Sequence, residues 1–261
     1  MKTELPKLKQ RQKEIQTLLY KFRFLNSLHI QKLLNHKHKE KIRIWLNDLT
    51  EKKYLKRYYS KKFAGTPAIY SLGLMSRRYF KKNKIKDVQV LLLDRIYREH
   101  KYTFKFKKHC MFLGEIYISL LSLAKKNKVK LRFFTNTDLR GMRYILLPEP
   151  DAYFAFEGKD NSAKRYFLDI IDNFMLNKDL KKRVEEYFNY FKKEYWQDHT
   201  GHAFPEVIMI CPDNRSKKYL EGQVSKMLYD EDANILFYLS TWGEIKSKGM
   251  KSEILHKVEV D

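Results

Sequence analysis

Apolar side chains recur at helical spacing in three consecutive stretches near the start of the chain. The three segments are 11–22, 24–35 and 40–54. Two β-rich runs follow them, at 54–61 and 67–73, with a glycine- and proline-containing turn between the runs. Three short helices followed by a β-hairpin are the element order of a winged helix-turn-helix, so the pattern predicts that fold for residues 1–85.

Near residue 85 the apolar periodicity weakens and the charge rises, and helices alternate with strands in the chain that follows. The predicted helices are 110–127, 178–199 and 216–230. The run at 88–102 could be a helix or a strand, and a helix is favoured. The predicted strands are 129–137, 151–158, 164–172, 204–212 and 235–242. Strands separated by helices imply crossover connections and a mixed sheet. We therefore predict an α+β or α/β chain of two domains, 1–85 and 86–261.

The composition supports a packed core in a reducing compartment. Of the 261 residues, 43% are hydrophobic, which is enough to bury a core and argues against wholesale disorder. Cys110 and Cys211 have no CxxC partners, so neither a zinc ribbon nor a disulfide framework is indicated. The first ten residues lack an apolar leader, and no uncharged run reaches the roughly 18 residues of a membrane span. We expect a cytoplasmic protein with no membrane partner.

The charge balance points to a polyanionic partner. Lys and Arg number 54 against 31 Asp and Glu, a net charge of +23, although a biased genome can produce a similar composition. The third predicted helix carries Lys39, Lys41, Arg43 and Asn47, and the hairpin carries Lys53, Lys56, Arg57, Lys61 and Lys62. Basic side chains at these places can neutralise phosphates, and Arg43 or Asn47 can reach base edges. The prediction is double-stranded DNA binding; the alternatives are a solvated packing module or a protein-binding winged helix.

Two acidic residues stand at corresponding places on consecutive strands of the second domain. Pro150-Asp151 opens the strand at 151–158, and Asp169 lies on the strand at 164–172. This arrangement resembles the restriction-endonuclease (PD-(D/E)xK) fold, in which the two carboxylates hold Mg²⁺ and a helix Glu, here Glu115, sometimes adds a ligand.

The resemblance to an active nuclease fails at the position of the catalytic lysine. Ile171 stands there, and an aliphatic side chain cannot polarise water. A basic residue from the next helix can replace it in some relatives, and the candidates are Lys178, Lys181, Lys182 and Arg183. The other interpretation is that Asp151 and Asp169 are structural hairpin residues.

The chain as a whole resembles the replication-relaxation family of plasmids and other mobile elements. The resemblance rests on "IQTLLYKFRFLNSLHIQKLL" and "IRIWLNDLTEKKYLKRYYSKKFAGTPAIYSLG", then on "EPDAYFAF", "YFLDIIDN", "KKRVEEYFNYF" and "FPEVIMIC". It implies a winged helix joined to a nuclease-like domain in which an acid-x-x-Asp motif replaces acid-x-Lys. By this resemblance Asp151, Asp169 and Asp172 carry the family pattern, and the protein binds DNA in plasmid replication, relaxation or transfer.

Three functions follow from these patterns. The preferred one is a DNA-binding protein whose nuclease-like domain lacks catalysis and binds DNA or a partner such as a relaxase or replication protein. The alternatives are a Mg²⁺-dependent DNA endonuclease with a relocated basic residue, and a winged-helix transcription regulator. Aromatic residues crowd the helix at 178–199, which is typical of a buried helix and also compatible with a homodimer interface.

Overall fold

The computed structural model describes residues 5–59, 66–85, 88–160 and 162–260. The chain divides into two compact units, Met1–Ile118 and Ser119–Asp261. The division falls within helix α6 (Phe104–Asn127), whereas the sequence predicts a domain boundary near residue 85. Residues 88–118 therefore belong to the first unit by their contacts.

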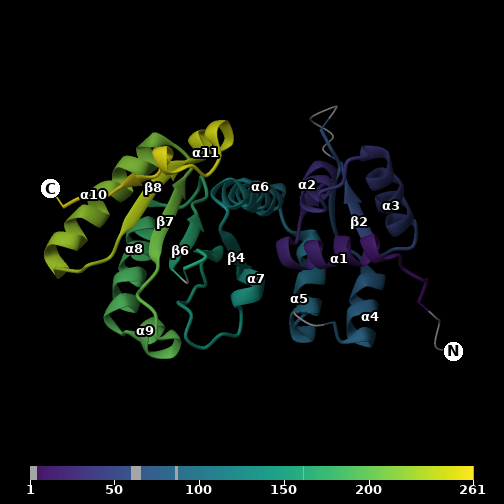
Figure 1. Ribbon diagram of the computed structural model, residues 1–261, viewed down its shortest axis with the longest axis horizontal. Helices are drawn as coiled ribbons and strands as arrows, with labels where there is room; N and C mark the ends of the chain where they lie inside the picture. Colours follow the sequence, from purple (N-terminus) through teal and green to yellow (C-terminus); the bar gives the residue numbers. More distant parts are fainter. Residues whose placement is uncertain (1–4, 60–65, 86–87, 161, 261) are drawn as a thin grey trace. The chain divides into compact units, whose positions relative to one another are not determined.

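The first unit begins with helices and a small antiparallel sheet, ordered as the sequence predicts (Figure 1). Its elements are α1 (Gln10–Phe22), β1 (Leu25–Asn26), α2 (Ser27–Leu33), α3 (Lys39–Glu51), β2 (Leu55–Tyr58), β3 (Ile69–Leu72) and α4 (Leu74–Asn83). Strand β3 lies between β1 and β2 and is antiparallel to both. The predicted helices and strands are confirmed, and their assignment to a winged helix-turn-helix stays a prediction.

The turn from β3 into α4 is closed by a glycine. The Gly73 amide donates a hydrogen bond to the Tyr54 carbonyl, 2.6 Å away, which brings the two backbones together. A Cβ atom at Gly73 would lie 2.4 Å from the Lys53 carbonyl oxygen, so no larger residue fits without backbone movement. Nearby, the buried Ser76 hydroxyl donates to the same Tyr54 carbonyl, and these contacts anchor α4 to the segment between α3 and β2.

The segment 88–102 does not form the continuous helix that the sequence favours. The structure has two short 3₁₀ turns, Val90–Leu92 and Glu99–Lys101, on either side of α5 (Leu93–Arg98). No side chain caps the first turn, and its Leu91 side chain is 94% exposed, so little holds a regular helix there. Glu99 is buried, with its carboxylate 3.5 Å from Arg23, and this contact ties the segment to the end of α1.

The second unit is built on a mixed six-stranded sheet, which confirms the predicted fold class. Its strands are β4 (Lys130–Thr135), β5 (Ala152–Glu157), β6 (Ala163–Ile170), β7 (Glu206–Cys211), β8 (Phe237–Thr241) and β9 (His256–Lys257). They lie in sequence order across the sheet. Strands β4, β5 and β6 are antiparallel, β6, β7 and β8 are parallel, and β9 is antiparallel to β8.

Helices connect the parallel strands. The helices of this unit, besides the end of α6, are α7 (Asn136–Leu139), α8 (Asn177–Lys192), α9 (Tyr195–Thr200), α10 (Asn214–Glu231) and α11 (Trp242–Lys248), with a 3₁₀ turn at Ser252–Ile254. Helices α8 and α10 pack against each other and against one face of the sheet (Figure 1). The core between them contains Phe167, Val207, Met209, Phe237 and Leu239 from the strands.

The long helix predicted at 178–199 is divided in two. Helix α8 ends at Lys192, and Glu194 adopts a positive φ of 53° before α9 begins at Tyr195. A left-handed residue cannot continue a right-handed helix, so the chain turns there. The turn carries Trp196 into the core of the sheet, where it is 3% exposed.

Candidate functional site

The exposed side of α3 carries both basic and acidic side chains, the acids being Glu40, Asp48 and Glu51. Ile42, Leu46 and Leu49 are buried in the first unit, which leaves the opposite side of the helix in solvent. The exposed basic residues of α3 are Lys39, Lys41 and Arg43. The Arg43 Nε lies 2.8 Å from the Glu40 carboxylate, and both side chains are about 70% exposed, so solvent weakens the pair. Ile44 is 60% exposed on the same helix.

Strand β2 contributes to the same surface through Arg57. The Arg57 Nη1 donates a hydrogen bond to the Asn47 Oδ1 of α3 over 2.9 Å. Because this bond uses the amide oxygen, the Asn47 NH₂ group retains its two donors for another acceptor. We call Lys39, Lys41, Arg43, Asn47 and Arg57 the α3–β2 surface. The bond fixes a cation of the strand beside a polar side chain of the helix.

Lys56 lies on the other side of β2. Successive strand residues point to opposite faces, and the Lys56 Nζ lies 4.8 Å from the ring centroid of Tyr97 on α5. On the same side, the Lys107 Nζ of α6 lies 4.3 Å from the Tyr58 ring, and burial lowers the pKa of Lys107. The predicted basic set is therefore divided between two faces of the strand. Lys53 is exposed just before β2, whereas Lys61 and Lys62 lie outside the described residues.

The predicted acidic residues of the hairpin lie close together in the second unit. The β5–β6 register pairs Ala152 with Leu168, which sets Asp151 opposite Asp169 at the end of the ladder. The Asp151 Oδ2 accepts a hydrogen bond from the Ile170 amide at 2.8 Å. Asp169 is buried, at 6% exposure, and Asp172 lies just beyond the end of β6.

Arg183 of α8 neutralises the Asp169 carboxylate. Its Nε and Nη2 donate to the two Asp169 oxygens over 2.6 and 3.1 Å, and both side chains are 8% exposed. The Arg183 Nη1 also donates to the Pro148 carbonyl at 2.8 Å and to the Glu186 carboxylate at 3.0 Å. Burial alone would lower the pKa of Arg183, but the charge of Asp169 and its hydrogen bonds raise it well above the usual value.

Tyr187 completes this buried cluster. Its hydroxyl lies 3.5 Å from the Arg183 Nη2, and the guanidinium carbon lies 4.8 Å from the centroid of its ring. Burial, followed by the negative charge of Asp169, raises the pKa of Tyr187 well above its ordinary value. Tyr187 therefore keeps its proton, and the cluster consists of one ion pair beside a neutral phenol.

The residues do not fit a Mg²⁺ site. Magnesium takes oxygen ligands, but both oxygens of Asp169 are occupied by Arg183. Across the described residues, no group of three or more His, Cys, Asp or Glu side chains is placed to share a metal ion. Glu115 lies in the first unit, where its Oε1 is 3.4 Å from the His29 Nε2. Ile171, at the position of the usual lysine, is buried.

The comparison with protein families decides the identity of the chain. A family described as replication-relaxation matches residues 17–207, which is well over half of the sequence. The chain belongs to the replication-relaxation family. The match runs from α1 to the start of β7, so it contains the α3–β2 surface and the Asp169–Arg183 pair. The family suggests a role in the replication or relaxation of a plasmid or another mobile element.

Two further comparisons gave no match. Neither the curated proteins nor the solved structures contain a significant relative of this replication-relaxation protein.

The sequence named Arg183 only as one of four basic candidates, and it gave no reason to single out Tyr187. A signal is present in retrospect, because Arg183 interrupts the apolar face of α8 between Leu180 and Tyr187. A charged residue on a buried face needs a partner of opposite charge. The partner, Asp169, is 14 residues away in sequence, so only the packing of α8 on the sheet identifies it.

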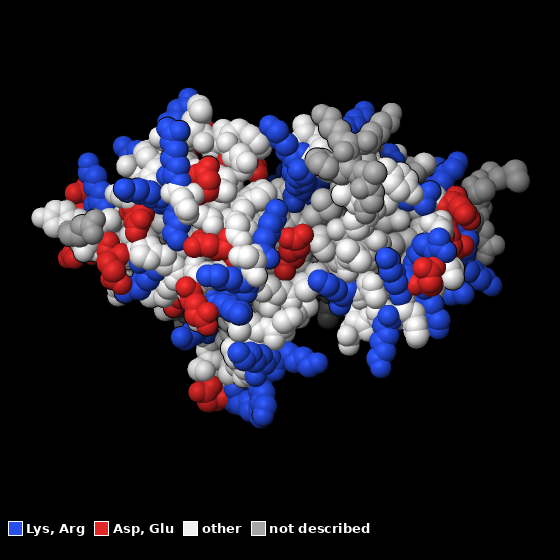
Figure 2. Space-filling model, turned by 90° about the horizontal axis from the view of Figure 1, so that it is seen from above, with Lys and Arg blue, Asp and Glu red and all other residues white. Residues whose placement is uncertain are grey.

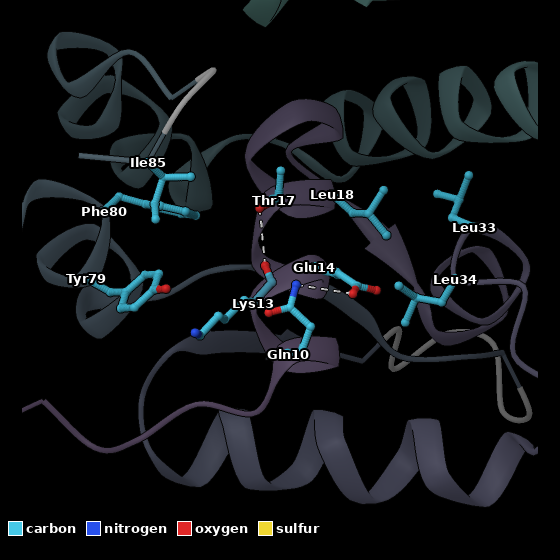
Figure 3. Close-up of a pocket in the computed structure, with 10 residues that line it drawn as sticks. All are labelled: Gln10, Lys13, Glu14, Thr17, Leu18, Leu33, Leu34, Tyr79, Phe80 and Ile85. Carbon is cyan, nitrogen blue, oxygen red and sulfur yellow. Dashed lines mark hydrogen bonds between the residues drawn. The ribbon is translucent and has the colours of Figure 1, made fainter. Parts of the chain in front are cut away.

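A cavity of about 550 Å³ lies along α1 in the first unit. Leu18, Leu33 and Leu34 line one side of it, and Tyr79, Phe80 and Ile85 line the other (Figure 3). Its polar groups bond within α1: Gln10 donates to Glu14, and the Thr17 hydroxyl donates to the Lys13 carbonyl. The cavity offers an apolar surface rather than a catalytic site.

Basic side chains are spread over the visible face of the protein rather than gathered into one patch (Figure 2). Acidic side chains lie between them, so local pairs interrupt the positive charge. None of the described helices combines the length and the apolar character that a membrane crossing requires.

Proposed function

We propose that this replication-relaxation protein binds double-stranded DNA through the α3–β2 surface. The hydrogen bond between Arg57 and Asn47 is the observation that carries the proposal. It holds a strand cation and a helix amide side by side in solvent, as needed to contact a phosphate and a base edge together. The net charge of +23 favours the same polyanionic partner.

Each part of the surface has a distinct task in this proposal. Lys39 and Lys41 at the start of α3 neutralise phosphates and set the register of the helix on the duplex. Arg43 leaves Glu40 to donate to a base or a phosphate, since a solvent-exposed ion pair costs little to break. Ile44, which is exposed on the same helix but is not part of the defined surface, presents an apolar group to the groove.

We propose further that the second unit is a nuclease-like domain without catalysis, which binds DNA or a protein of the replication or relaxation machinery. The bidentate pairing of Asp169 with Arg183 supports this view. To bind a cation, Asp169 would have to release Arg183, and the guanidinium would then be left buried without its main counter-ion.

Duplex binding is tested with the full chain by fluorescence anisotropy on a labelled DNA duplex. Arg57→Ala and Asn47→Ala should each weaken binding by about 1–3 kcal/mol. The double variant should lose less than the sum, because the two residues share one hydrogen bond. Lys82→Gln is the matched control, since it removes one charge from an exposed position on α4, outside the surface. Equal effects of all three substitutions would contradict the proposed interface.

The absence of catalysis is tested on supercoiled plasmid with Mg²⁺ or Mn²⁺. The proposal expects the plasmid to stay uncut at protein concentrations that saturate duplex binding. Cleavage by the wild-type protein that disappears in both Asp151→Ala and Asp169→Ala would establish a nuclease and overturn this part of the proposal.

A further inference from the structure

A second cavity, of about 340 Å³, opens beside the C-terminal half of α8 in the second unit. Ile145, Leu146 and Tyr190 form buried parts of its wall. The Tyr190 hydroxyl donates to the Tyr144 carbonyl, so the apolar ring rather than the hydroxyl is available to line the cavity. The volume lies in the range of about 300–1,000 Å³ that is usual for small-ligand sites.

The rim of the cavity combines exposed apolar groups with cations. Leu147 is 71% exposed and Tyr195 is 48% exposed, so two large apolar groups at the opening are open to a ligand. The Lys193 Nζ lies 5.9 Å from the centroid of the Tyr195 ring. Arg143 supplies a second exposed cation, and Asn189 supplies an exposed amide.

The acid of the lining does not cancel these cations. Glu186 belongs to the wall of the cavity, but its carboxylate accepts a hydrogen bond from the Arg183 Nη1 at 3.0 Å. Arg183 already balances the charge of Asp169, so Glu186 keeps its negative charge. Arg143 and Lys193 exceed Glu186 by one positive charge, so the lining still favours an anionic ligand.

A ligand that fits must have a flat apolar face, a hydrogen-bonding edge and a negative group nearby. We propose that this cavity binds an unpaired base of single-stranded DNA, stacked on Tyr195, with its flanking phosphates beside Arg143 and Lys193. Stacking on an exposed aromatic ring within a basic groove is the general mode of single-strand binding. The bases of a duplex are not available to stack on Tyr195, because they are already stacked on their neighbours.

This inference rests on the proposed function and extends it to a second form of DNA. Arg183 and Tyr190 are seven residues apart on α8, so the cavity begins about 10 Å along the helix from the Asp169–Arg183 pair. A protein that acts in replication or relaxation meets unpaired strands beside duplex. The α3–β2 surface would hold the duplex, and the cavity would hold a base of the exposed strand.

The test measures binding of the full chain to a fluorescein-labelled oligothymidylate by anisotropy. Tyr195→Ala should weaken single-strand binding by roughly 5- to 150-fold, which corresponds to the loss of one stacked base. Tyr195→Trp should keep the affinity, since the ring and not the hydroxyl is needed. The matched control is Tyr229→Ala, which removes a ring that is 74% exposed on α10 and does not line the cavity. Equal loss in Tyr195→Ala and Tyr229→Ala overturns the proposal.

Photo-crosslinking gives a second readout that needs no variant. An oligonucleotide containing iododeoxyuridine is irradiated with the wild-type protein, and the crosslinked peptide is identified by mass spectrometry. The expected peptide contains Tyr195, and crosslinks confined to other peptides would overturn the assignment. Competition by free thymidine monophosphate as strong as that by the oligonucleotide would instead identify a mononucleotide site and overturn the single-strand assignment.

The outcomes separate this inference from the proposed function. If the wild-type protein binds duplex through the α3–β2 surface but does not bind the oligothymidylate, the cavity proposal fails and the proposed function stands. If Arg57→Ala leaves duplex binding unchanged while Tyr195→Ala weakens single-strand binding as expected, the proposed duplex interface fails and the cavity proposal stands.

Discussion

Replacing Arg183 by alanine is predicted to destabilise the second unit strongly. The substitution removes two charge-assisted hydrogen bonds to Asp169, at 2.6 and 3.1 Å, and leaves that carboxylate buried. Hydrogen bonds to charged groups contribute about 1.5–3 kcal/mol each, so two of them account for about 3–6 kcal/mol. Removing one partner of a buried ion pair costs about 3–5 kcal/mol, which agrees with that sum.

The measurement is urea unfolding followed by tryptophan fluorescence. The chain has three tryptophans, and Trp45 belongs to the first unit, so a Trp45→Phe background leaves only Trp196 and Trp242 of the second unit. The free energy of unfolding should fall by about 3–5 kcal/mol in Arg183→Ala. In the control Lys182→Ala it should change by less than about 0.5 kcal/mol, because Lys182 is an exposed neighbour on the same helix.

A double variant separates the ion pair from the packing around it. In Arg183→Met with Asp169→Leu both charges are gone, and a well-packed apolar pair often replaces a buried ion pair without loss. The double variant should therefore recover most of the stability lost in Arg183→Ala. A loss below about 1 kcal/mol in Arg183→Ala would refute the reasoning, because it would mean that Asp169 is not held by Arg183 in solution.

Two other predictions concern the stability of single elements. Gly73→Ala should lower the free energy of unfolding of the first unit by about 1–3 kcal/mol, because its Cβ would meet the Lys53 carbonyl at 2.4 Å; an unchanged urea midpoint would contradict the close approach. Asp213→Ala removes the N-cap of α10 and should cost about 0.5–2 kcal/mol at neutral pH. Hydrogen bonds from Ser216 lower the pKa of Asp213, so this contribution is present above about pH 4 and is lost as the pH falls through the lowered pKa. Unfolding of the wild-type protein and of Asp213→Ala is followed by circular dichroism at neutral and at acidic pH. The difference in their free energies of unfolding should shrink in acid, and a difference that grows in acid would contradict the cap.

Periodicity was sufficient to predict most of the fold. The apolar stripe of Ile42, Leu46 and Leu49 predicts α3 and its buried side, and the structure buries all three. The nearly continuous apolar run before Cys211 predicts a strand buried on both faces, and β7 is such a strand. These features depend on local spacing, which a single sequence displays.

The features that the sequence did not predict depend on tertiary contacts or on single backbone angles. The break between α8 and α9 follows from the positive φ of Glu194, a residue type that gives no local signal for it. The two-residue strand β1 exists only because β3 pairs with it. Strand alternation alone separates Lys56 from Arg57, but the contact of Lys56 with Tyr97 requires α5 to lie against that side of β2.

The candidate site was predicted in part. The sequence placed Asp151 and Asp169 on consecutive strands, and the register of β5 with β6 sets them opposite each other. The apolar stripe of α8 separates Arg183 from Lys178, Lys181 and Lys182, because of the four only Arg183 lies between Leu180 and Tyr187 on the buried face. The sequence does not show which acid that buried face meets, because the contact with Asp169 depends on how α8 packs on the sheet.

The salt dependence of duplex binding tests the central claim most directly. Each phosphate neutralised contributes about −0.9 to the slope of log affinity against log salt concentration. Lys39→Gln with Lys41→Gln should therefore make the slope shallower by about 1.8, while Lys82→Gln on α4 should leave it unchanged. This result would show that α3 lies against the DNA backbone. A slope that is the same in the wild-type protein and in the α3 double variant would contradict the account.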